Sequence, residues 1–216
     1  MTISATTQGI KPGVTTSTNR PTVPFDGQVI SETDTDSLKV YKSSTWGSVS
    51  GLVHLNTTAW SGVTATIDSV FSSAYTHYKI IVSATASTGS ATAILTQLRV
   101  GGVTNAGSTA YSSARSGYNF STGAINADVT NATTSWFLWR GNGSSSLGGG
   151  FGGSMDIHYP AVATPTWISG TSVDGAYQAS AGGFHNVSTA YDGVIFTNNA
   201  GGTTTGTISI FGYANS

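Results

Sequence analysis

Hydrophobic and polar positions alternate along most of the chain beyond residue 51, with the period of two that β-strands require. The clearest case spans residues 77–84, where Tyr78, Ile80, Val82 and Ala84 alternate with a second, more polar set. Further β-prone runs predict strands at residues 94–100, 110–120, 135–140, 154–159, 167–173, 193–197 and 207–213. Gly-Gly, Asn-Gly and Asp-Gly pairs separate these runs and mark turns. This pattern predicts an all-β fold, a jelly-roll-like β-sandwich over residues 51–216.

The first fifty residues follow a different pattern. Residues 1–20 show no sustained period and contain the breakers Pro12 and Gly13, so we expect an extended arm that is ordered only against a partner. Residues 21–50 hold three short β-prone runs between turn signals, which predicts a small β-meander. Within the sandwich, the glycine-dense stretch 141–153 is predicted to be a projecting loop.

Composition supports the all-β interpretation and removes several function classes. The chain of 216 residues contains 34 Thr, 31 Ser and 28 Gly, whereas charged residues make up only 8%. Residues that build exposed helix faces are scarce, so a helical or α/β fold is disfavoured. The absence of cysteine excludes disulfides, thiolate zinc sites and a thiol nucleophile. A net charge of −1 gives no electrostatic footprint for nucleic acid or an anionic membrane, so neither is an expected partner.

The sequence shows no targeting signal. The opening residues, Met-Thr-Ile-Ser-Ala-Thr-Thr-Gln, lack the basic start and apolar core of a secretory signal peptide. No apolar run approaches the ~20 residues that span a bilayer, so membrane insertion is not expected.

Candidate catalytic groups are few and scattered. The carboxylates beyond residue 51 are Asp68, Asp128, Asp156, Asp174 and Asp192. The last two precede glycine and are interpreted as turn formers, so general acid–base hydrolysis would need two of the other three to converge. Phosphate loops and hydrolase motifs are missing from the sequence. We therefore expect a protein that is not an enzyme, with no catalytic site and no cofactor.

Metal binding also receives little support from the sequence. The four histidines, His54, His77, His158 and His185, lie far apart in the chain. Asp156 and His158 are two residues apart, so on a strand they would share one face and could ligate one ion. We favour a solvated polar edge at this position, and no metal site is predicted.

Aromatic residues are the positive signal in the main body. Exposed Trp and Tyr stack on sugar faces, and Asn, Ser and Thr supply hydrogen bonds, so the composition suits glycan binding. Core packing is the competing interpretation, and for each single tryptophan we favour the core or an interface. Loops at residues 141–153, 174–175 and 192–193 are where we expect a ligand. The aromatic residues considered are Trp60, Trp136, Trp139, Trp167, Tyr75, Tyr111, Tyr118, Tyr159, Tyr177 and Tyr191.

Two stretches resemble a known class of proteins. Residues 19–46, with Asn19-Arg20-Pro21, Pro24-Phe25-Asp26-Gly27-Gln28, Glu32-Thr33-Asp34-Thr35 and Ser44-Thr45-Trp46, resemble a segment common in tailed-bacteriophage tail and fibre proteins. The C-terminal runs Gly183-Phe184-His185-Asn186, Tyr191-Asp192-Gly193 and Gly206–Tyr213 resemble the distal β-domain of phage fibre and appendage proteins. Together these stretches cover about a third of the chain.

The resemblance implies a homotrimer in the virion, made in the host cytoplasm and needing no signal peptide. Its N-terminal part, residues 1–50, would attach to other virion proteins, while the sandwich faces outward toward host-surface polysaccharide. The sequence has no heptads or fibrous repeats between residues 50 and 60, so a fibre would be short. A capsid decoration protein that stabilises the head is the alternative, and a free lectin or glycan-degrading enzyme is a more remote one.

Overall fold

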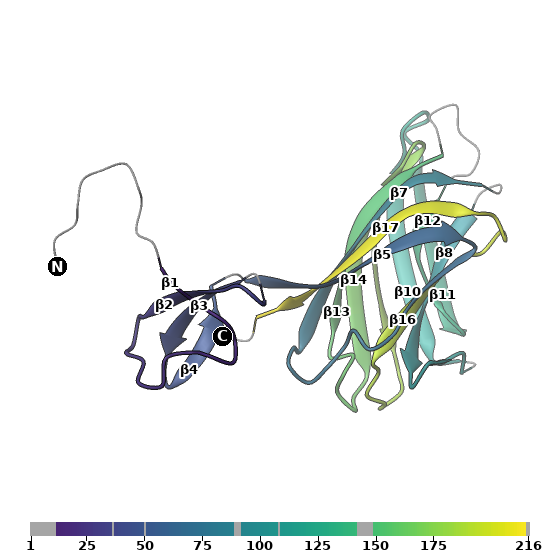
Figure 1. The fold of residues 1–216 in the computed structure, drawn as a ribbon. Helices are drawn as coiled ribbons and strands as arrows, with labels where there is room; N and C mark the ends of the chain where they lie inside the picture. The colour runs from purple at the N-terminus through teal and green to yellow at the C-terminus, as the bar shows by residue number, and fades with distance from the viewer. Residues whose placement is uncertain are drawn as a thin grey trace. The chain divides into compact units, whose positions relative to one another are not determined.

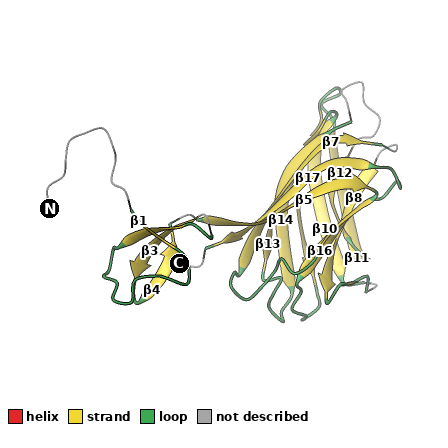
Figure 2. Cartoon of the chain, in the orientation of Figure 1, coloured by secondary structure: helices red, strands yellow, loops and turns green. Residues whose placement is uncertain are grey.

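The computed structural model describes residues 12–35, 37–49, 51–88, 92–107, 109–141 and 149–214. Throughout these ranges the chain forms strands, turns and loops, which confirms the prediction of an all-β protein built on a β-sandwich (Figure 2). Among the same residues no helix is long and apolar enough to cross a membrane. The chain divides into two compact units, Met1–Val53 and His54–Ser216.

The N-terminal unit is a sheet of four strands in sequence order. These are β1 (Gly13–Thr15), β2 (Val29–Glu32), β3 (Ser37–Lys42) and β4 (Thr45–Ser48). Strands β2, β3 and β4 coincide with the three runs of the predicted meander. Strand β1 pairs parallel with β2, so that Gly13 lies opposite Ile30. The expectation that residues 1–20 are ordered only against a partner is therefore wrong for residues 13–15, while residues 1–11 lie outside the described residues.

An ion pair with a buried carboxylate and a tight turn hold this small sheet. Glu32 is fully buried and accepts a hydrogen bond from Arg20 Nε at 2.5 Å and one from Thr35 Oγ1 at 2.8 Å. The bond from Arg20 is the main cause that lowers the pKa of Glu32. Between β3 and β4, Ser43 and Ser44 both have positive φ, as a two-residue turn that matches strand twist requires.

The C-terminal unit, here called the body, is a sandwich of two mainly antiparallel sheets (Figure 1). The larger sheet has the order β11-β10-β15-β14-β13-β7-β17-β5, and the smaller has the order β12-β8-β16-β6 with β9 paired to β8. The strands of the larger sheet are β5 (Leu52–Gly62), β7 (His77–Ser87), β10 (Tyr111–Asn119), β11 (Ile125–Thr133), β13 (Phe151–His158), β14 (Thr166–Asp174), β15 (Tyr177–His185) and β17 (Thr204–Tyr213). The strands of the smaller sheet are β6 (Thr64–Ile67), β8 (Thr92–Val100), β9 (Val103–Thr104), β12 (Trp136–Gly141) and β16 (Gly193–Asn198).

The core lies between the two sheets. Strand β12 of the smaller sheet packs against β10, β14 and β15 of the larger one. Trp60 and Trp136 are almost completely buried in this core, as is Tyr111, whose ring meets that of Trp136 edge-on at 5.0 Å. The core-packing interpretation is therefore correct for Trp60 and Trp136. The side chain of Trp139 lies outside the described set.

All eight strands predicted for the body are present within a few residues. The prediction missed the longer strands β5, β11 and β15 and the short strands β6 and β9. The predicted loop at residues 141–153 is wrong at both ends, because Gly141 closes β12 and Phe151–Gly153 opens β13. Residues 142–148 lie outside the described part of the chain.

Candidate functional site

The larger sheet has one face on the core and one face turned away from it. Strand β14 shows the alternation: Ile168 is buried, whereas Trp167, Ser169 and Thr171 are exposed. The residues that share this outward face on the neighbouring strands are mostly small or hydroxylic. They include Ser112, Ala114, Ser116, Ser154, Ser180 and Gly182.

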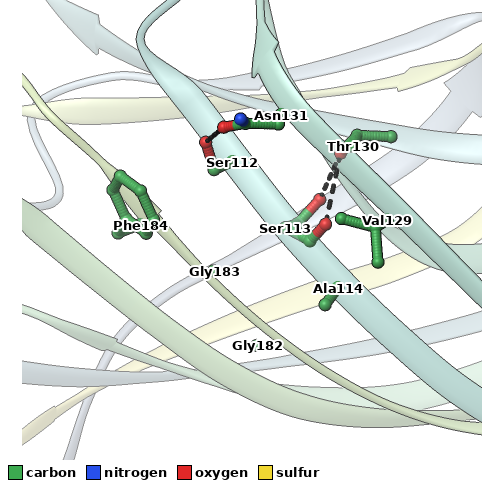
Figure 3. A pocket seen from close by; sticks show the side chains of 9 residues that line it. All are labelled: Ser112, Ser113, Ala114, Val129, Thr130, Asn131, Gly182, Gly183 and Phe184. Atoms are coloured by element: carbon green, nitrogen blue, oxygen red, sulfur yellow. Dashed lines mark hydrogen bonds between the residues drawn. The ribbon is translucent and has the colours of Figure 1, made fainter.

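A groove of about 460 Å³ lies on the outward face where β11, β10 and β15 run side by side (Figure 3). Its volume falls within the ~300–1,000 Å³ that small-molecule sites occupy. The lining is mostly apolar, with hydroxyl and amide groups on the β10–β11 side. The lining residues are Ser112, Ser113, Ala114, Val129, Thr130, Asn131, Gly182, Gly183 and Phe184.

A β-bulge in β11 shapes one side of the groove. Tyr111 lies opposite Thr133, but Ser113 lies opposite Thr130, so β11 contains one residue more than β10 over this interval. Ala132 takes up the extra length with a φ of 55°. Bulges bend and twist the strand that carries them, and here the bulged strand is the sheet edge that borders the groove.

Side-chain hydrogen bonds hold the bulge to β10. Ser112 Oγ donates to Asn131 Oδ1 at 2.7 Å and accepts a bond from the Ala132 N–H at 3.4 Å. One strand position further, the hydroxyls of Ser113 and Thr130 lie 2.8 Å apart. The bond from Ser112 uses only the amide oxygen of Asn131, so the two amide donors of Asn131 are not consumed by it.

The floor and the opposite wall of the groove follow from side-chain size. Ala114 and Gly182 are small, and a Cβ added to Gly182 would meet only the Ile168 carbonyl oxygen, at 3.6 Å. Phe184 on β15 forms the wall and is 42% exposed, while Val129 on β11 is 77% exposed. The groove therefore combines an open aromatic ring, a shallow floor and a polar rim.

An aromatic row continues from the groove across the outward face. In the register of the sheet, Phe184 lies opposite Trp167, which in turn lies opposite His158. Tyr159, which follows β13, brings its ring centroid to 6.1 Å from that of Trp167. Trp167 is 44% exposed and Tyr159 is 38% exposed, so these rings are available to a ligand or partner.

Charges on this face are few and paired. Lys79 Nζ lies 3.4 Å from Asp156 Oδ1, which also accepts a hydrogen bond from the Tyr213 hydroxyl at 2.6 Å. That bond is the main cause that raises the pKa of Tyr213 to about 12. Arg115 and Asp128, paired at 2.7 Å, lie on the opposite, core-facing side of β10 and β11, where the Arg115 guanidinium stacks over the Phe137 ring. The arrangement suits a neutral ligand better than a strongly charged one.

The structure separates the carboxylates that the sequence singled out. Asp68 is bound to Arg99, Asp128 to Arg115 and Asp156 to Lys79, so each of these three pairs with a different cation. Asp174 Oδ1 accepts bonds from the backbone N–H groups of Ala176 and Tyr177, which bears out its interpretation as a turn former. Asp192 directly precedes β16, and its Oδ2 accepts a bond from the distant Gly101 N–H, so its interpretation as a turn former is not borne out.

Two further expectations need correction. Asp156 and His158 do share a face, but β13 lies between β14 and β7 inside the larger sheet, so their position is not a sheet edge. The ring centroids of His158 and His77 lie 5.0 Å apart. The two histidines are 81 positions apart in the sequence, so this contact was not expected. The groove lies on a sheet face rather than on the predicted loops. The residues around it gave no motif, because its strands β11 and β15 are rich in Ala, Ser, Asn and Gly.

Comparisons with known proteins add little. No family model matches the sequence, and no curated protein matches it. Among solved structures, the "Structure of infectious bursal disease virus Gx strain" aligns with 10% sequence identity and a TM-score of 0.12. The alignment covers 82% of this chain and 46% of the viral one, so the chain spans less than half of that protein's length. A likeness at this score carries no argument about function.

Proposed function

We propose that the chain is a non-enzymatic structural protein of a tailed-bacteriophage virion that binds a host-surface glycan in the groove of the body. It acts as a short trimeric fibre, attached to other virion proteins through residues 1–50. The observation that supports this function best is the groove itself, with the exposed ring of Phe184 facing the polar Ser112–Asn131 side. The virion setting rests on the resemblance to phage fibre sequences.

The groove has the chemistry that recognises a sugar ring. The C–H face of a sugar stacks on an aromatic ring such as Phe184, and its hydroxyls bond to amide and hydroxyl groups such as those of Asn131 and Ser112. The floor of Ala114 and Gly182 leaves room for the ring. The scarcity of unpaired charge on this face favours a neutral glycan.

A trimer would make such binding useful. Stacking with a few hydrogen bonds typically leaves a single sugar site near millimolar affinity, about −4 kcal/mol. Three linked sites raise the avidity by about 10² to 10⁴ when all of them engage together. The proposal therefore requires the purified protein to be a trimer, whose mass by sedimentation is three times the 22.0 kDa of one chain.

Competition for host cells tests the glycan site. The purified protein should block phage adsorption, while Phe184→Ala and Gly182→Leu should weaken this competition at least tenfold by removing the aromatic wall and filling the floor. Ser83→Leu is the matched control, because Ser83 lies on the same face in β7, three strands away from β15. Unchanged competition by both groove variants, with the trimer intact, would refute the site.

A capsid decoration protein is the second candidate, and the exposed edge of the larger sheet favours it. Around β11, four large apolar residues are 54–77% exposed: Tyr118, Phe120, Ile125 and Val129. Apolar surface at a sheet edge commonly marks an interaction site. Imaging of labelled particles separates the two candidates, since decoration places the protein on the head and predicts that the purified protein does not bind host cells.

A further inference from the structure

Two histidine rings meet on the outward face of the larger sheet. His158 of β13 lies directly opposite His77 of β7. The Tyr159 N–H donates to the Thr76 carbonyl at 2.7 Å, so residues 159 and 76 form a hydrogen-bonded pair of the antiparallel ladder. The adjacent pair, His158 and His77, is therefore a non-hydrogen-bonded pair. Such pairs bring their Cα atoms to about 4.5 Å, closer than bonded pairs. The two Nδ1 atoms are 3.0 Å apart.

This separation is the one that a shared metal ion requires. With metal–nitrogen bonds of about 2.0–2.1 Å, two imidazole nitrogens on one ion lie about 2.9 Å apart at a right angle and about 3.4 Å apart at a tetrahedral angle. The observed 3.0 Å falls between these values. The two rings are joined by a hydrogen bond between these atoms, so a metal ion would replace the bridging proton at a similar nitrogen–nitrogen separation.

The rings are also held in place by their neighbours. Tyr159 follows directly on β13 with a φ of 61°, a conformation that costs free energy for a residue with a side chain. This turn places the Tyr159 ring 4.9 Å from the His77 ring, and the indole of Trp167 packs edge-on against Tyr159. The strained turn thus orders the surroundings of the histidine pair.

We propose that His77 and His158 bind one divalent transition-metal ion through their Nδ1 atoms. Imidazole ligands suit Zn²⁺, Ni²⁺ and Cu²⁺, whereas Ca²⁺ and Mg²⁺ take oxygen ligands. Within the described residues, no group of three or more His, Asp and Glu side chains gathers at any point, so water completes the coordination. The positive charge of Lys79 on the same face is offset by its pairing with Asp156.

The surroundings of His158 act on its pKa. Burial, followed by the proximity of His77, lowers the pKa of His158, and the neighbouring Asp156 only partly opposes this shift. Neutral imidazole is the form that ligates metal.

Titration of tag-free protein with Zn²⁺ and with Cu²⁺ tests this site. We expect one ion per chain, and electron paramagnetic resonance of the Cu²⁺ complex should show two equivalent imidazole nitrogens. His77→Asn and His158→Asn should each weaken binding at least tenfold, and the double variant should abolish it. His54→Asn is the matched control, because His54 is an exposed histidine of β5 bonded to Thr57.

The proposal fails if the wild-type protein binds neither ion at 100 μM metal and neutral pH. It also fails if the folded double variant binds as tightly as the wild type, or if the copper spectrum shows a single nitrogen. Circular dichroism and the thermal midpoint confirm that each variant is folded. These readouts are independent of glycan binding, so the outcome does not depend on the proposed function.

Discussion

Trp136 donates a hydrogen bond from its indole Nε1 to the backbone carbonyl oxygen of Phe184, across 3.0 Å. Trp136 belongs to β12 of the smaller sheet, and Phe184 belongs to β15 of the larger one, so this bond joins the two layers of the sandwich. The side chain of the same Phe184 forms the wall of the groove on the other face. The position of the groove wall is therefore tied to the packing of the core beneath it.

Replacement of Trp136 by Phe removes this bond and part of the ring volume. The partly buried carbonyl of Phe184 loses a donor and a cavity opens in the core, so we expect a loss of about 2–4 kcal/mol in the free energy of unfolding. Urea denaturation followed by tyrosine fluorescence or circular dichroism measures this loss. Trp167→Phe provides the control, since Trp167 is 44% exposed, and should change stability by less than about 0.5 kcal/mol.

Two adjacent glycines in β15 should respond in opposite ways to the same substitution. A Cβ on Gly183 would lie 2.5 Å from the Ser112 carbonyl oxygen and 3.1 Å from Trp136 Cδ1, so Gly183→Ala should separate β15 from β10 and cost about 1–3 kcal/mol. Gly182→Ala meets only ordinary contact and should be neutral or slightly stabilising, because alanine loses less chain entropy than glycine on folding. Equal thermal midpoints for the two variants would contradict this account of β15.

The hydrophobic pattern predicted most of the longer strands that are buried on one face, and it missed β11 and β15, where the alternation is weak. β7 alternates clearly because Tyr78, Ile80 and Val82 all face the core. β11 is a sheet edge with exposed residues on both faces, so no alternation marks it in the sequence. β15 carries Gly182 and Gly183, of which Gly183 is closely approached by its neighbours, and glycines in a sequence suggest a turn as readily as a strand.

The same physics explains why the groove could not be found from the sequence. Its walls come from β11 and β15, the two strands with the weakest pattern, and its bulge is defined by a register that only the paired strands reveal. The meeting of His77 with His158 likewise depends on the pairing of β7 with β13 across 81 positions. Residue types alone identified aromatic and hydroxyl chemistry, but the pairing of the strands decides which of these groups lie together.

A buried histidine should make the free energy of unfolding of the body depend on pH. His185 is fully buried, and its Nε2 lies 2.7 Å from the Tyr191 hydroxyl, which also accepts a hydrogen bond from Asn105 Nδ2 at 2.7 Å. When the Tyr191 hydroxyl donates its proton to His185 Nε2, the bond requires the imidazole to be neutral at that nitrogen. Burial lowers the pKa of His185 to about 4.

Below pH 6.5 the unfolded chain takes up a proton at His185 that the folded chain rejects until about pH 4. The stability that this histidine provides is therefore complete above pH 6.5 and is lost as the pH falls, at about 1.4 kcal/mol per pH unit and about 2 kcal/mol by pH 5. We expect the free energy of unfolding, measured with urea between pH 7.5 and 5, to fall more steeply in the wild type than in His185→Gln. The difference between the two curves cancels the contributions of the other titrating groups, which both proteins share. Parallel curves over this range would show that His185 is protonated in the folded body, and that the bond from Tyr191 does not hold it neutral.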